Sequence, residues 1–119
     1  MIGSSVLVVD DEVGMRETVA EILTGVGYEV TTAVDGEDAL SRLRTTTFSV
    51  VVMDIRMPGR DGIAVLREIG GPPPPVVLMT AYAADDHLNA AAEAGSFAVL
   101  HKPVPAQRLL DLVARAAAS

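Results

Sequence analysis

A small set of polar residues could carry phosphoryl chemistry, because each member lies at or just after the end of an apolar run, where a strand would end. The members are Asp10, Asp11, Asp54, Thr80 and Lys102. Hard divalent cations such as Mg²⁺ prefer carboxylate, carbonyl and water oxygens. A carboxylate can act as the nucleophile in phosphoryl transfer, and an ammonium and a hydroxyl can stabilise the oxygens of the transferred group. The residue types therefore fit a cation-assisted transfer of a phosphoryl group to an aspartate, if one fold brings them together.

Taken singly, each of these residues has an ordinary structural explanation. An Asp at a strand end most often caps a helix or lies in a solvated loop, and a lone Thr or Lys there is a turn or surface residue. Their joint occurrence at the ends of four different strands favours a functional site.

Five apolar, β-branched runs recur along the chain and predict five strands. The runs are Val6–Val9, Tyr28–Thr32, Phe48–Met53, Val76–Met79 and Phe97–Leu100. Several are continuous rather than alternating, which is typical of strands covered on both faces in a parallel sheet. The carboxyl ends of parallel strands lie at one edge of a sheet, where ligands bind in such folds. The polar set is therefore expected along that edge.

Segments with helical periodicity separate the runs. Their apolar faces are marked by Met15, Val19, Ile22, Leu23 and Val26, then by Ala39, Leu40 and Leu43, by Ile63, Leu66 and Ile69, by Leu88, Ala91 and Ala92, and by Leu109, Leu112, Val113 and Ala116. Asp35 is expected to cap the second helix, Gly27 and Gly95 to follow helix ends, and Pro105 to lie in the first turn of the last helix. Strand–helix alternation repeated five times predicts an α/β three-layer sandwich.

Length and composition narrow the class of protein. The chain has 119 residues, and we expect one domain over 1–119. With 16 acidic and 9 basic residues its formal charge is −7, which argues against direct nucleic-acid binding. There is no cysteine, so disulfides and thiolate chemistry are excluded. No signal peptide and no run of about 20 apolar residues is present, so we expect a cytoplasmic protein without membrane contact.

The chain resembles a response-regulator receiver domain over about residues 4–117. The resemblance rests on Val6-Leu-Val-Val-Asp-Asp-Glu12, on Met53-Asp-Ile-Arg-Met-Pro-Gly-Arg-Asp-Gly62, on Thr80-Ala81 and on Lys102-Pro103. It implies a flavodoxin-like (βα)5 fold, a five-stranded parallel sheet in the order 2-1-3-4-5. It also implies that Asp54 accepts a phosphoryl group from a sensor histidine kinase or a phosphotransfer protein.

The resemblance further implies roles for the other residues of the set. Asp11 and Asp54 would bind Mg²⁺ (or Mn²⁺) directly, Asp10 would act through a metal-bound water, and the backbone carbonyl of Arg56 would complete the protein ligands. Lys102 would pair with Asp54 and then with the phosphoryl oxygens, and the Thr80 hydroxyl would move to the phosphoryl group. The Lys102–Pro103 bond is expected to be cis, and Gly62 to let its helix start close to the site.

Three positions vary within or depart from the family pattern: Val99, Tyr82 and Arg56, the last of which presents a charge beside the acceptor. Receivers often carry Tyr or Phe three residues before the lysine, where this chain has Val99, so coupling of an aromatic ring to Thr80 is in doubt. Phe97 is expected to pack in the core rather than to replace that ring. Tyr82, two residues after Thr80, would either shield the phosphoryl group or cover the fourth helix.

The implied function is a switch rather than an enzyme, limited to self-phosphorylation from a phosphodonor and autodephosphorylation. Its output surface, for a homodimer or an effector, would be the face of the fourth helix, fifth strand and fifth helix. We expect a piece of a longer regulator rather than a stand-alone receiver. The alternatives are a degenerate receiver that binds protein independently of phosphorylation, a haloacid-dehalogenase-type hydrolase and an FMN-binding flavodoxin. The last two are disfavoured because adjacent aspartates, rather than Asp-x-Asp or a phosphate-binding loop, follow the first strand.

Overall fold

The computed structural model describes residues 4–81 and 85–119, and of residues 85–87 only the backbone. Five parallel strands form one sheet in the order β2-β1-β3-β4-β5, as expected. The strands are β1 (Ser5–Val9), β2 (Glu29–Ala33), β3 (Val50–Asp54), β4 (Val76–Thr80) and β5 (Ala98–His101). The helices are α1 (Val13–Gly25), α2 (Gly36–Thr45), α3 (Gly62–Glu68), α4 (Asp85–Glu93) and α5 (Ala106–Ala117).

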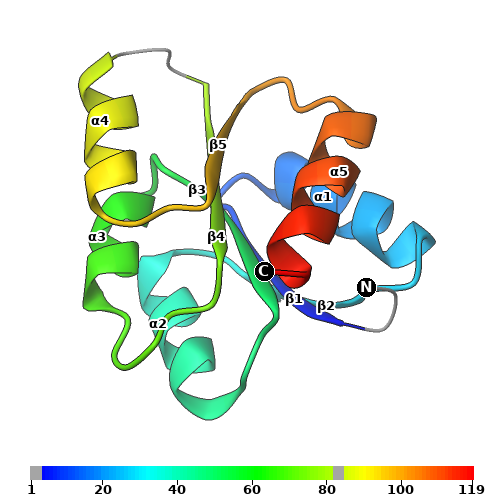
Figure 1. Ribbon diagram of the computed structural model, residues 1–119, viewed down its shortest axis with the longest axis horizontal. Coiled ribbons are helices and arrows are strands. Elements are labelled where there is room, and N and C mark those ends of the chain that lie inside the picture. The colour runs from blue at the N-terminus through cyan, green and yellow to red at the C-terminus, as the bar shows by residue number, and fades with distance from the viewer. Residues whose placement is uncertain (1–3, 82–84) are drawn as a thin grey trace.

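The helices cover both faces of the sheet. Helices α1 and α5 lie on one face, and α2, α3 and α4 lie on the other (Figure 1). Alternate residues of β1 divide between the two cores: Val6 and Val8 pack with the α1 and α5 side, and Leu7 and Val9 with the α2 and α3 side. The three central strands β1, β3 and β4 are buried along almost their whole length, which explains their continuous apolar runs.

The predicted strands and helices are confirmed, with bounds that differ by a residue or two. Asp35 caps α2 by accepting a hydrogen bond from the Asp38 amide (2.8 Å). Gly27 and Gly95 have φ of 100° and 92°, the left-handed conformation expected just after a helix. Among the described residues, no helix is both long and apolar enough to cross a membrane.

Three details of the apolar pattern and the place of one proline were predicted wrongly. Val26 is 40% exposed, because α1 ends at Gly25 and the chain turns away at Gly27. Phe97 is also 40% exposed rather than in the core, because it precedes the short edge strand β5. On α4, Ala91 is buried but Ala92 is exposed, because only one narrow stripe of the helix faces the sheet. Pro105 is the N-cap of α5 and not a residue of its first turn.

Candidate functional site

The predicted polar residues all lie at the carboxyl edge of the sheet. Asp10 directly follows β1, Asp54 and Thr80 are the last residues of β3 and β4, and Lys102 directly follows β5. Backbone hydrogen bonds hold these strand ends in register: the Ile55 amide donates to the Met79 carbonyl (2.8 Å), and the Lys102 amide to the Thr80 carbonyl (2.7 Å). The sheet therefore brings together residues that are up to 92 positions apart in the chain.

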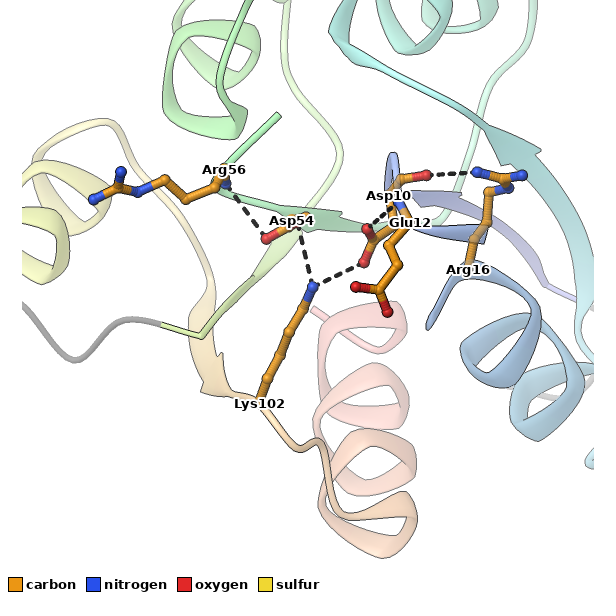
Figure 2. Close-up of polar contacts among 6 residues, drawn as sticks. All are labelled: Asp10, Glu12, Arg16, Asp54, Arg56 and Lys102. Atoms are coloured by element: carbon orange, nitrogen blue, oxygen red, sulfur yellow. Dashed lines mark hydrogen bonds and ion pairs between the residues drawn. The ribbon is translucent and has the colours of Figure 1, made fainter. Parts of the chain in front are cut away.

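The Lys102 ammonium lies between two carboxylates. Its Nζ donates to Asp10 Oδ2 at 3.0 Å and lies 3.3 Å from Asp54 Oδ2 (Figure 2). Asp10 is completely buried and Asp54 is only 6% exposed. A buried carboxylate without a partner is strongly destabilising, so Lys102 compensates both acids across the end of the sheet.

Three carboxylates form an acidic cluster, defined as Asp10, Asp11 and Asp54. One oxygen from each can be chosen so that all three lie within 4.8 Å of one another. The octahedral Mg²⁺ distance of about 2.1 Å corresponds to oxygen–oxygen separations of about 3.0 Å for adjacent ligands and about 4.2 Å for opposite ones. The three carboxylates are thus close enough to share one such cation, either directly or through a bound water. Oxygen ligands of this kind suit Mg²⁺ or Mn²⁺.

The pKa of Asp54 is raised from its ordinary value. Burial is the largest cause, because it disfavours the charged carboxylate, and the negative charge of Asp10 adds to it. The positive charge of Lys102 and hydrogen bonds from Lys102 and the Arg56 amide act in the opposite direction but do not cancel the increase. The fold therefore holds Asp54 in an unfavourable ionised state that a cation would relieve.

The pKa of Lys102 is raised as well. Burial is the largest single influence and lowers the pKa, but the hydrogen bond and charge of Asp10, together with those of Asp54, outweigh it. Lys102 is therefore a permanent cation at neutral pH. The Lys102 ammonium can pair with the negative charge of Asp54 or of a group attached to Asp54.

The loop from Asp54 to α3 approaches the acceptor closely, which explains Gly62. A Cβ on Gly62 would lie 2.4 Å from the Asp54 carbonyl oxygen, and the Gly62 amide donates to the Ile55 carbonyl (2.7 Å). Asp61 caps α3 through the Ala64 amide (2.7 Å), and Gly59 has a φ of 79°. The expectation that Gly62 lets its helix begin close to the site is thus confirmed, and the reason is the lack of space for a side chain.

Arg56 contributes its backbone to the site. Its amide lies 3.4 Å from Asp54 Oδ1, and its side chain extends away from the acidic cluster (Figure 2). The guanidinium is exposed. That the Arg56 carbonyl is a metal ligand stays a prediction.

Thr80, Val99 and Phe97, the residues considered for coupling the site to the rest of the fold, differ in their burial. Thr80 is completely buried at the end of β4, next to Asp54's strand. Val99 is partly buried against the core on the α2 and α3 side, and the exposed Phe97 precedes β5 instead of supplying a ring in its place. The Lys102–Pro103 bond is cis, as expected. Tyr82 lies outside the described residues.

Two arginines near the site were missed by the sequence reasoning. The Arg16 side chain, from the first turn of α1, donates to the Asp10 backbone carbonyl at 2.8 Å. Arg60, in the loop before α3, pairs with Glu37 of α2 and Glu68 of α3. Neither contact follows a local pattern: the partners of Arg60 lie 23 and 8 residues away, and the partner of Arg16 is a main-chain atom.

Comparison with known proteins identifies the family of the chain. Residues 6–114 match the family model described as "Response regulator receiver domain". A response regulator receiver protein of Anaeromyxobacter sp. is 42% identical over 108 residues, which cover 89% of this chain and 45% of that protein. The transcriptional regulatory protein ZraR of Salmonella typhimurium is 38% identical over 115 residues, 95% of this chain and 26% of the relative. The chain thus spans less than half the length of these relatives.

Solved structures show the same fold. A CheY-like receiver domain protein from Methanospirillum hungatei superimposes with a TM-score of 0.92 at 25% identity, covering 98% of this chain and 94% of the other. A structure described as a response regulator from Chloroflexus aurantiacus has a TM-score of 0.92 at 30% identity, covering 98% and 99% of the two chains. With a family match over most of its length, this chain belongs to the response regulator receiver domain family.

Proposed function

We propose that the chain is a phosphoacceptor switch that receives a phosphoryl group on Asp54 from a phosphohistidine of a sensor histidine kinase or phosphotransfer protein, in a Mg²⁺-dependent reaction in the cytoplasm. The observation that carries the proposal is the pairing of one ammonium with two buried carboxylates at the carboxyl edge of the sheet. A purely structural salt bridge needs only one carboxylate for one ammonium. The surplus of buried negative charge indicates a site for a cation and a transferring group.

The transfer is a displacement at phosphorus. An Asp54 carboxylate oxygen forms a bond to phosphorus, the phosphorus–nitrogen bond of the donor breaks, and the released imidazole nitrogen takes a proton from solvent. When bound, Mg²⁺ would be held by oxygens of Asp11 and Asp54, with Asp10 behind a water, and would neutralise charge on the phosphoryl oxygens. Lys102 needs to shift little, because it already lies 3.3 Å from Asp54.

Thr80 is proposed to convey the modification to the rest of the fold. It ends the strand next to β3, and its carbonyl accepts a hydrogen bond from the Lys102 amide. A hydroxyl drawn toward a phosphoryl group on Asp54 would therefore act on both β4 and the start of the β5–α5 connection. The face of α4, β5 and α5 is the proposed surface for a homodimer or effector, and exposed Phe97 borders it.

The proposed activity is limited to taking up the phosphoryl group and losing it again by hydrolysis. We therefore expect no turnover of phosphate esters, which a haloacid-dehalogenase-type hydrolase would show. A steady-state assay with such an ester separates the two functions.

The direct test is to incubate the protein with Mg²⁺ and acetyl phosphate and to follow its mass. Wild type is expected to gain one phosphoryl group and Asp54→Asn none. The control Asp111→Asn, which changes a partly exposed carboxylate of α5, is expected to gain as much as wild type. Modification of Asp54→Asn to the wild-type extent contradicts the assignment of the acceptor. A folded wild type that takes up neither phosphoryl nor beryllofluoride supports the degenerate, binding-only receiver instead.

A further inference from the structure

The Arg16 guanidinium is the side chain that ties α1 to the loop of the acidic cluster. Arg16 lies in the first turn of α1, is half-buried, and donates from Nη1 to the Asp10 backbone carbonyl at 2.8 Å (Figure 2). Within the part of the chain that the structure describes, Arg16 forms no ion pair with any carboxylate. Its charge therefore lies near the acids without occupying their oxygens.

The atom that Arg16 binds controls two side chains at once. The Asp10 carbonyl belongs to the planar peptide unit that joins Asp10 to Asp11, so fixing this oxygen fixes the plane between their Cα atoms. On the other side of the turn, the Glu12 amide donates to Asp10 Oδ1 at 3.0 Å. Glu12 is the N-cap of α1 but makes no side-chain capping bond, so the turn is not anchored by the usual device.

We propose that Arg16 is a positioning residue for the cation site: it holds the Asp10–Asp11 peptide so that both carboxylates converge with Asp54. This inference rests on the proposed function, since it assumes that the acidic cluster binds Mg²⁺. The planar guanidinium suits the role better than an ammonium, because its donors are fixed in direction.

Two effects of Arg16 on cation binding have opposite signs. A positioning contact tightens Mg²⁺ binding, whereas a positive charge close to the acidic cluster weakens it. Removal of groups that orient metal ligands typically weakens binding about 10- to 100-fold. Arg16 acts through the backbone, and its removal also takes away a positive charge that repels the cation. We therefore expect an effect smaller than that range, about three- to tenfold.

The experiment compares Arg16→Met and Arg16→Lys with the matched control Arg67→Met. Arg67 is an exposed arginine in the last turn of α3, at the end of the helix away from Gly62, which meets Asp54. Its removal therefore changes net charge equally but leaves the site intact. Calorimetric titration with MgCl₂ is expected to show about three- to tenfold weaker binding for Arg16→Met, intermediate binding for Arg16→Lys and less than twofold change for the control. Equal or tighter binding by Arg16→Met overturns the proposal, and would identify Arg16 as a repelling charge only.

A second measurement needs no metal. In EDTA, amide hydrogen exchange of Glu12 is expected to be several-fold faster in Arg16→Met than in Arg67→Met, while the amides of β1 keep their protection. Equal acceleration throughout the protein would mean that Arg16 only stabilises the fold, and would also overturn the proposal. If the wild type binds no Mg²⁺ but Arg16→Met still shows the local exchange effect, the proposed function is contradicted. The positioning of the turn by Arg16 is then still supported.

Discussion

Replacement of Asp54 by Asn should stabilise the metal-free protein, although it removes the proposed phosphoacceptor. The structure places the Asp54 carboxylate 3.3 Å from Lys102 Nζ and within 4.8 Å of an Asp10 oxygen. At an effective dielectric constant of about 20, these distances correspond to about 5 kcal/mol of attraction and at least about 3.5 kcal/mol of repulsion. The two nearly cancel, so the cost of burying the charge, on the order of several kcal/mol before compensation, decides the sign.

The expected magnitude is about 1–2 kcal/mol of added stability at pH 7, because the amide avoids the charge but keeps an oxygen that can accept from Lys102. For a domain of this size, that raises the Tm by roughly 3–10 °C. Thermal unfolding by circular dichroism in EDTA measures the change. Asp111→Asn, which removes a partly exposed carboxylate paired with Arg115, serves as control and should change stability by less than about 0.5 kcal/mol.

The pH dependence supplies an independent check. The pKa of Asp54 is raised in the folded protein above its ordinary value of 3.8, so the folded state binds this proton more tightly than the unfolded state does. The stability that protonation of Asp54 provides is complete below the unfolded pKa and is lost as pH rises through the folded pKa. The advantage of Asp54→Asn over wild type should therefore be greatest at neutral pH and shrink on acidification toward pH 4.

Saturating Mg²⁺ should reverse the comparison, because the cation binds the folded wild type and so stabilises it. No gain of Asp54→Asn in EDTA, or a gain that does not shrink in acid, refutes the idea that the buried acids are in electrostatic conflict without a cation.

Three further outcomes follow from the same geometry. Lys102→Met should destabilise the metal-free protein by about 3–5 kcal/mol, because two buried carboxylates lose their cation. Urea unfolding in EDTA measures this change, and a loss of stability under about 1 kcal/mol contradicts the pairing of Lys102 with both acids. Gly62→Ala should destabilise the protein by about 2 kcal/mol or more, since its Cβ would meet the Asp54 carbonyl oxygen at 2.4 Å. Gly14→Ala, with open space around it, should stabilise α1 by roughly 0.5–1 kcal/mol. Similar Tm changes in the two variants would refute the close contact at Gly62. Asp35→Ala should cost about 1 kcal/mol through the lost α2 cap, and an unchanged Tm would show that the cap is replaced by solvent.

The sequence by itself determined the strands, the helices and the edge at which the site lies. Continuous valine-rich runs can be satisfied only in a sheet covered on both faces, and period-3.6 stripes supply the helices that cover it. Once the strands are parallel, chain order alone places Asp10, Asp54, Thr80 and Lys102 at one edge. The receiver motif added the strand order and the expected roles.

The tertiary structure decided the features that depend on contacts between distant segments. Periodicity did not show that Val26 lies beyond the end of α1, or that Phe97 would be exposed at the edge of the sheet, since an apolar residue continues a pattern regardless of where its element stops. The sharing of Lys102 between Asp10 and Asp54 required the distances across three strand ends. Arg16 was invisible in sequence because its partner is a backbone oxygen, which every residue carries. Residue types and their order thus specify which groups reach the carboxyl edge, and the packed fold alone specifies which of them touch.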